Sequence, residues 1–233
     1  MARFDPTRDY DSDAARVFDC LKGGGIAIVH MDVAYAVMSG TEEALRNVYA
    51  AKRRSFDKAS GIVANHRTHD EIHLLPDEKK EIISTITDKH DLPISVIAPF
   101  RTSHPLIKEL TPFLFNIATR NGTVNFLLNA SPLREKIAAH SLEHNFPLIA
   151  SSANVSQRGT KYTADTIEAE VLSAADIIID YGPASYMDQG NEADFPLSST
   201  QIDFQNMRIV RRGICFDRIE ECLRNEYGIT LAE

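Results

Sequence analysis

Two basic side chains separated by one residue, Lys52 and Arg54, could bind a phosphate or carboxylate group. If this segment is not helical, a spacing of two residues directs both side chains to the same side. Arginine then offers a planar fork of donors to the anion, and lysine a compact point charge. The alternative is a solvated helix C-terminus, where basic side chains interact favourably with the helix dipole. From these residues alone, both interpretations stay open.

A second polar cluster, Ser151-Ser152-Ala153-Asn154, follows a short apolar segment. The hydroxyl of Ser152 and the amide of Asn154 could hydrogen-bond phosphate or ribose oxygens at the end of a strand, where ligand sites concentrate. The alternative is a local turn or helix cap, which Ser and Asn favour through hydrogen bonds to the nearby backbone. Neither serine lies in a GxSxG motif, so the sequence does not favour a serine hydrolase.

A third cluster pairs Ser198-Ser199-Thr200 with Arg211-Arg212-Gly213. Hydroxyls at the end of a loop, with arginine on a nearby strand, again fit phosphate binding. The alternative is β-propensity together with charge on an edge strand. Neither GxxxxGK[ST] nor GxGxxG occurs, so the sequence predicts neither a P-loop nor a dinucleotide-binding fingerprint.

Three histidines, His66, His69 and His73, would share one face if this segment were helical, a spacing compatible with a metal. The sequence shows no cysteine or distant fourth ligand to complete such a site, and the stretch is polar throughout. A solvated helix is therefore the better interpretation, and we expect no metal site.

The elements that must position these residues alternate between strand-like and helix-like segments. We expect a helix over residues 11–21 with Ser12 as its N-cap, and a second helix that begins after Thr41. Further helices are expected at 76–86, 132–143, 166–174 and from 217, with partial helix at 106–115. Strands are expected at 26–29, 61–64, 94–98, 123–128, 147–150, 177–180 and 201–210, and the apolar strand at 177–180 is expected to be buried. The pattern predicts an α/β fold with a mixed sheet, antiparallel within residues 88–128. The polar segment 182–198 should be a loop, which raises the question of a lid.

Composition bounds the remaining possibilities. The 233 residues carry a formal net charge of −8, which works against broad, non-specific binding to nucleic acid. No export signal and no apolar run of ~18 residues is evident, so we expect a cytoplasmic protein with no membrane partner. The three cysteines are expected to be free thiols. We expect one domain over 1–233, with a core at about 12–215 and a C-terminal helix at 217–227.

Taken in order, these clusters resemble the YrdC-like family. The similarity covers roughly residues 12 to 215 and lies in the run Gly24-Gly25-Ile26-Ala27-Ile28-Val29 followed by Tyr35, and in Lys52-x-Arg54, Ser152-x-Asn154, Ser199-Thr200 and Arg211-x-Gly213. The resemblance implies a twisted, mostly parallel mixed sheet with helices on both sides, folded around a large basic cavity.

The resemblance also implies an activity, that of a nucleotidyltransferase. L-Threonine, bicarbonate and ATP would give L-threonylcarbamoyl-AMP and pyrophosphate with Mg²⁺, in support of a tRNA modification that other proteins complete. The implied catalytic residues, which also bind ATP, are Lys52, Arg54, Ser152 and Asn154. Further implied contacts with ATP come from Ser199, Thr200 and Arg211, and contacts with the amino acid from Asp32 and Tyr35.

The chain departs from the family at the end of the site that binds the amino acid. The family's Pro-Thr-Asp/Glu-Thr-x-Tyr-Gly-Leu segment reads His30-Met31-Asp32-Val33-Ala34-Tyr35-Ala36-Val37, and a strand arginine is replaced by Leu127. An apolar side chain cannot bind a carboxylate as arginine does. Two alternatives therefore remain: a paralogue that uses another amine or carbamoyl donor, and a non-catalytic protein that binds ATP or RNA. The resemblance also implies tRNA or tRNA-modifying proteins as partners.

Overall fold

The computed structural model describes residues 4–191 and 195–232. Its strands form one sheet in the order β10-β9-β4-β6-β3-β7-β2-β1-β8, with β5 paired to β6. The strands are β1 (Ile26–Val29), β2 (Ala36–Ser39), β3 (Gly61–Ile62), β4 (Ile94–Pro99), β5 (Thr119–Arg120), β6 (Thr123–Leu128), β7 (Ile149–Ser152), β8 (Ile177–Ile179), β9 (Gln201–Asp203) and β10 (Arg208–Arg211).

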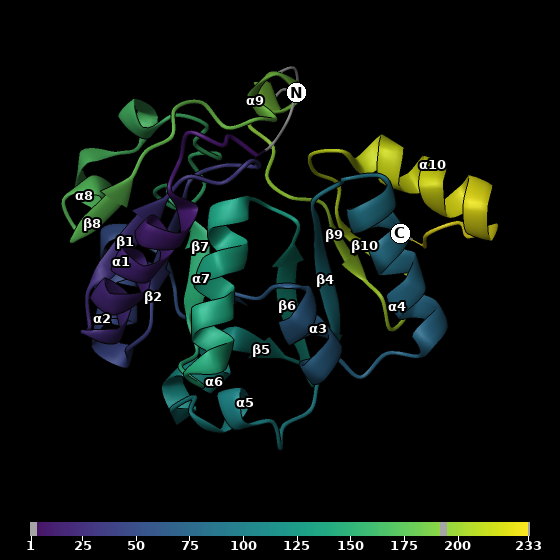
Figure 1. Cartoon of the computed structure of the whole chain (residues 1–233), viewed down its shortest axis with the longest axis horizontal. Helices are drawn as coiled ribbons and strands as arrows, with labels where there is room; N and C mark the ends of the chain where they lie inside the picture. The colour runs from purple at the N-terminus through teal and green to yellow at the C-terminus, as the bar shows by residue number, and fades with distance from the viewer. Residues whose placement is uncertain (1–3, 192–194, 233) are drawn as a thin grey trace.

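The helices surround this sheet (Figure 1). They are α1 (Tyr10–Lys22), α2 (Glu42–Ala51), α3 (His66–Ile72), α4 (Asp77–Ser84), α5 (Pro105–Lys108), α6 (Pro112–Ala118), α7 (Pro132–Glu143), α8 (Ala169–Leu172), α9 (Met187–Asn191) and α10 (Phe216–Tyr227). A π-helical turn, Thr85–Lys89, prolongs α4, and a 3₁₀ turn, Ala164–Thr166, precedes α8.

The sheet is mixed, as the sequence predicts. The pairs β1–β8, β3–β6 and β4–β9 are parallel. The other ladders are antiparallel, including β4–β6 inside the segment 88–128. Antiparallel pairing thus takes a larger share of the sheet than the resemblance implies.

Strand β1 shows why helices cover both faces of the sheet. Its side chains alternate, and Ala27 and Val29 belong to the main core with residues of α1 and α7. Ile26 and Ile28 point to the opposite face and pack in a second cluster with residues of α2 and α8. In Figure 1, α1 and α7 lie together over the sheet, consistent with their direct packing. The unbroken apolar run of β1 therefore reflects burial on both faces.

Three expectations about these elements need correction. Asp9, not Ser12, caps α1, because its carboxylate accepts the Ser12 N–H at 3.0 Å. The strand predicted at 147–150 is β7, which extends to Ser152, because β7 pairs with β2 through that residue. The predicted buried strand at 177–180 lies at the sheet edge, where Ile178 is 42% exposed.

The sequence also predicts a loop at 182–198, free cysteine thiols and no membrane-spanning segment. The predicted loop 182–198 contains the short helix α9, and its residues 192–194 lie outside the described part of the chain. The three cysteines are free, as expected. Among the described residues, no helix has the length and apolar character needed to cross a bilayer.

Candidate active site

A cavity of about 490 Å³ lies against one face of the central strands. Alternation along β4 and β6 decides which side chains reach it. Ser95 and Ile97 of β4 line the cavity, as do Thr123, Asn125 and Leu127 of β6, while the residues between them are buried in the core. The same two strands therefore build the core on one face and the cavity on the other.

The charged residues that line this cavity are all arginines: Arg54, Arg120, Arg134 and Arg211. Among the described lining residues there is no Asp, Glu or Lys. Field lines from four cations inside a concave site raise the local concentration of anions. A net acidic protein thus contains a strongly positive cavity, as an anionic ligand requires.

Lys52 does not line the cavity with Arg54. Helix α2 ends at Lys52 in helical conformation, and Arg53 follows with a left-handed φ of 48°. The expectation that Lys52 and Arg54 point the same way is therefore wrong, because it assumed an extended segment. Arg54 faces the cavity, its Nη2 donates to the Ala59 carbonyl at 2.6 Å, and its Nε is buried without a hydrogen-bond partner.

The Lys52 side chain instead holds the segment that carries the serine and asparagine. It is 1% exposed, and its amine donates to the carbonyls of Ser152 and, at 2.7 Å, Asn154. The Ser156 N–H returns a bond to the Lys52 carbonyl at 2.8 Å. Burial, and then the Arg54 charge, lower the pKa of the Lys52 amine to about 7. The two motifs are thus joined into one unit by this buried amine.

Ser152 and Asn154 occupy different positions in that unit. Ser152 lines the cavity and donates its hydroxyl to Asn154 Oδ1. The Asn154 amide in turn donates to the Val155 carbonyl at 2.7 Å, and Asn154 is buried outside the cavity lining. Ser152 can therefore touch a ligand, and Asn154 fixes the orientation of its hydroxyl.

Arg211 and Ser199 both line the cavity and contact each other. The Arg211 guanidinium donates to the Ser199 carbonyl at 2.9 and 2.8 Å and to its hydroxyl at 3.0 Å. Ser199 Oγ also lies 2.9 Å from Ser95 Oγ of β4. Burial lowers the pKa of Arg211 to about 10, so the side chain stays cationic at neutral pH.

Thr200 and Gly213 hold the segment 198–200 against the segment 211–213. Thr200 is fully buried, donates its hydroxyl to the Ile214 carbonyl at 2.8 Å, and accepts the Gly213 N–H at 3.1 Å. A Cβ on Gly213 would lie 2.2 Å from the Ser198 carbonyl oxygen. Only glycine fits this close approach, and Thr200 supports these segments without reaching the cavity.

Asp32 and Tyr35, implied to contact the amino acid, direct their polar atoms elsewhere. Asp32 Oδ1 accepts from Ser185 Oγ at 2.7 Å, outside the cavity lining. Tyr35 lines the cavity, but its hydroxyl donates to Asp180 and lies 2.8 Å from the Gly182 carbonyl. Burial and the Asp180 carboxylate raise the pKa of Tyr35. Both polar groups hold neighbouring segments in place.

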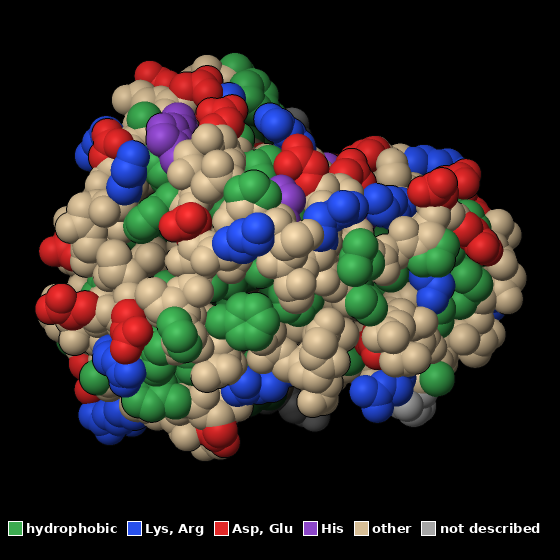
Figure 2. Space-filling view, turned by 90° about the horizontal axis from the view of Figure 1, so that it is seen from below, with side chains coloured by type: hydrophobic (Ala, Val, Ile, Leu, Met, Phe, Trp, Pro, Cys, Tyr) green, Lys and Arg blue, Asp and Glu red, His purple; other side chains and the backbone are tan. Residues whose placement is uncertain are grey.

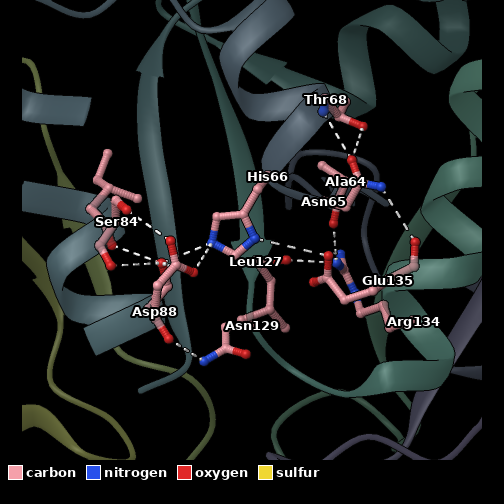
Figure 3. A network of polar contacts seen from close by, with 12 residues as sticks. Ala64, Asn65, His66, Thr68, Ser84, Asp88, Leu127, Asn129, Arg134 and Glu135 are labelled. Atoms are coloured by element: carbon pink, nitrogen blue, oxygen red, sulfur yellow. Dashed lines mark hydrogen bonds and ion pairs between the residues drawn. The ribbon is translucent and has the colours of Figure 1, made fainter. Parts of the chain in front are cut away.

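The histidine segment is a helix, α3, but the expectation that it is solvated is wrong. His69 and His73 are each 2% exposed, with their Nδ1 atoms 2.7 Å apart, and the His73 ring stacks on Phe126. Burial lowers the pKa of His69 to about 4. His66 turns away to Thr87 and lies between two carboxylates (Figure 3), so the three imidazoles do not converge on one point.

Sequence reasoning missed Arg134 and Asn125, which both line the cavity. Arg134 had a signal: with Ile137, Ala138 and Ser141 it falls at helical spacing on the buried face of α7. A charged residue on such a face needs a partner or a ligand. Asn125 had none, because a polar residue alternating with apolar ones is expected on a solvated strand face.

Comparison with known proteins agrees with this architecture. A family model described as "Telomere recombination", which groups Sua5, YciO and YrdC proteins, matches residues 19–213. A Methanocaldococcus jannaschii protein named "Putative threonylcarbamoyl-AMP synthase" is 25% identical over 183 residues, which span 76% of this chain and 79% of that protein.

Solved structures share the fold. A hypothetical protein of Streptococcus mutans, smu.1377c, superposes with a TM-score of 0.75 at 19% identity, covering 92% of this chain and 91% of that one. P. abyssi Sua5 complexed with L-threonine gives 0.68 at 18% identity, covering 96% of this chain and 62% of the longer Sua5 chain. E. coli YciO gives 0.62 at 14% identity, covering 87% and 90%.

The resemblance inferred from the ordered motifs is thereby confirmed. Of the residues that carry it, five line one cavity: Tyr35, Arg54, Ser152, Ser199 and Arg211. Because the family model spans most of the chain, this protein belongs to the Sua5/YciO/YrdC family.

Proposed function

We propose that this protein forms a carbamoyl-adenylate from ATP, bicarbonate and an amino acid, in the manner of an L-threonylcarbamoyl-AMP synthase. The observation that carries the proposal is the cavity lined by arginines, to which Arg54, Ser152, Ser199 and Arg211 all contribute. Membership of the family and the name of the M. jannaschii relative support the same class of transferase.

The proposed reaction asks little covalent chemistry of the protein. The amine of the amino acid captures CO₂ derived from bicarbonate, and a carbamate oxygen then attacks the α-phosphorus of ATP while pyrophosphate leaves. Such a reaction is accelerated by holding the two reactants in line and by neutralising charge that develops on the phosphate oxygens. Arg54 and Arg211 supply the positive charge, and the Ser152 and Ser199 hydroxyls orient the phosphate oxygens.

Lys52 and Asn154 enter this proposal as positioning residues. The Lys52 amine is already bonded to two backbone carbonyls, and the Asn154 amide oxygen to the Ser152 hydroxyl. Direct contact between Lys52 and ATP requires the amine to leave these carbonyls. Their joint effect is to hold Ser152 at the cavity.

Mg²⁺ fits the cavity only as part of the nucleotide. The described lining residues offer hydroxyl and amide oxygens but no carboxylate, the ligand that Mg²⁺ most often takes from proteins. We therefore propose that the ion enters bound to the ATP phosphates, where it neutralises part of their charge.

A function as an RNA-binding protein is the less favoured alternative. The underside in Figure 2 shows acidic and basic side chains interspersed, with no continuous basic surface among the residues described on that face. Together with a net charge of −8, this favours a small anion inside the protein over a polyanion on its surface. The protein then contributes to tRNA modification through the product that it supplies, and not by binding RNA on its surface.

The decisive experiment measures pyrophosphate release from MgATP and bicarbonate with L-threonine, and then with a panel of other amino acids and amines. We expect release that depends on the amino acid and is lost in Arg54→Ala. Arg16→Ala is the matched control, since Arg16 is an exposed arginine that pairs with Asp13 on α1. Release with an amine other than threonine would identify a paralogue of different specificity. Binding of ATP with no release under any condition would refute the enzymatic proposal.

A further inference from the structure

Three polar side chains in the cavity wall have a buried atom without a hydrogen-bond partner: Nε of Arg54, Nε of Arg134 and Oδ1 of Asn125. Asn125 belongs to β6, and Arg134 is bonded to the Leu127 carbonyl of the same strand. Buried polar groups in folded proteins are normally paired, so an unpaired donor and an unpaired acceptor in the same cavity point to a ligand that supplies the missing partners.

Arg134 is a fixed cation, and the charge of the neighbouring Glu135 carboxylate offsets only part of the lowering of its pKa by burial. Its side chain is held in place, because Nη1 donates to the carbonyls of Leu127 at 2.5 Å and Ala64 at 2.7 Å (Figure 3). Among the described residues, no carboxylate forms an ion pair with it. Arg134 is 2% exposed, and burial lowers its pKa to about 10, so the charge persists at neutral pH. A buried guanidinium of this kind favours binding of a carboxylate.

Asn125 lies two residues before Leu127 on β6, on the same face of the strand and about 7 Å away along it. Its neighbour on β3 is Gly61, where an added Cβ would lie 3.1 Å from the Asn125 carbonyl oxygen. Glycine there keeps β3 close to β6 and leaves the Asn125 amide uncovered by a side chain at that position. The free amide oxygen can accept an N–H.

We propose that Arg134 and Asn125 form the acceptor subsite of this protein, which takes an α-amino acid with a small, uncharged side chain. This inference rests on the proposed function. Arg134 binds the carboxylate through its unpaired edge, and Asn125 Oδ1 accepts an N–H of the amine. Around them the cavity wall is apolar, formed by Ile62, Ala118 and Leu127.

The same arrangement explains the loss of the strand arginine at Leu127. The Leu127 carbonyl now receives the Arg134 guanidinium, so a cation from α7 reaches the wall beside the position where the family places one on β6. An amino acid with a basic side chain is rejected, because four arginines already line the cavity. A large aromatic side chain would have to displace the apolar wall.

The test measures binding of L-threonine, L-serine and L-valine by calorimetry, without nucleotide and with the non-hydrolysable α,β-methylene analogue of ATP. For the wild-type protein, each acid should bind at least tenfold tighter than its own amide, which lacks the carboxylate. Arg134→Met should lose this discrimination, since methionine fills similar space without charge. Arg134→Lys should retain part of it, and Asn125→Leu should weaken both acid and amide equally. Arg16→Met, outside the cavity, should behave as wild type.

The outcomes separate this inference from the proposed function. Unchanged discrimination in Arg134→Met, or a wild-type protein that binds none of the acids in either condition, would overturn the subsite. Acids that bind with the expected discrimination but give no pyrophosphate release would overturn only the proposed reaction. If Arg134→Met fails to fold, Asn125→Leu decides the matter, and unchanged binding of acid and amide in that variant would overturn the subsite.

Discussion

Replacing Lys52 by methionine should change how the stability of the protein depends on pH. The Lys52 amine has a pKa of about 7 in the folded protein against 10.5 for an unperturbed lysine. Between these values the unfolded chain binds a proton that the folded protein does not, so the free energy of unfolding rises with pH. The penalty for burying the charged amine is fully present below pH 7 and disappears as the pH rises toward 10.5.

The size of this effect follows from the shift. A difference of 3.5 pKa units, 10.5 minus about 7, corresponds to at most about 5 kcal/mol over the whole range. From pH 6.5 to pH 8.5 the contribution is about 2 kcal/mol. The wild-type protein should therefore gain about 2 kcal/mol relative to Lys52→Met over this interval, which is well within the resolution of urea denaturation.

The assay is equilibrium urea unfolding of both proteins at pH 6.5, 7.5 and 8.5. Lys79→Met is the matched control, because the Lys79 amine also donates to two backbone carbonyls, those of Phe204 and Gln205, but from a half-buried position. Groups shared by both proteins cancel in the difference. Parallel stability curves for wild type and Lys52→Met would refute the assignment of Lys52 as a buried amine that loses its proton near neutral pH.

Three further changes test other parts of the structure. Gly213→Ala should lower the free energy of unfolding by about 1–3 kcal/mol in urea titrations, because the new methyl group would meet the Ser198 carbonyl; unchanged stability would contradict that contact. Asp9→Ala should cost about 1 kcal/mol of thermal stability by removing the N-cap of α1, and Asp9→Asn should restore most of it. Below pH 6.5 the unfolded chain binds protons that the buried His69–His73 pair does not, so the free energy of unfolding of the wild type should fall toward pH 4, by about 3 kcal/mol for His69. Replacing both histidines by leucine should flatten this dependence between pH 7 and pH 5.

Much of the fold could be predicted from local sequence signals. Helix α7 begins and ends at the predicted residues, because Ser131 and Pro132 start it and Asn145 follows it in left-handed conformation. Strand β1 was predictable because its apolar run is long enough for a strand and too short for a helix. By contrast, the order of strands in the sheet depends on long-range pairing that no short window of sequence contains.

The candidate site was predictable only in part. Order along the chain identified Arg54, Ser152 and Arg211, which line the cavity. It could not show that Lys52 turns away, since this follows from the left-handed conformation of Arg53, a residue type with no preference for it. Arg134 stands out in the sequence as a charged residue at helical spacing with the buried residues of α7, but no local signal shows that this part of α7 meets the cavity.

Strand β6 restricts where the chain can gain or lose residues. Its odd-numbered side chains from 123 to 127 face the cavity, and its even-numbered ones pack in the core. Inserting or deleting one residue within β6 would exchange the two sets and place Asn125 in the core and Phe126 in the cavity. Changes of length should therefore be tolerated only at the exposed Asn121-Gly122 turn that precedes the strand. Natural relatives of differing length should differ there rather than within the strand.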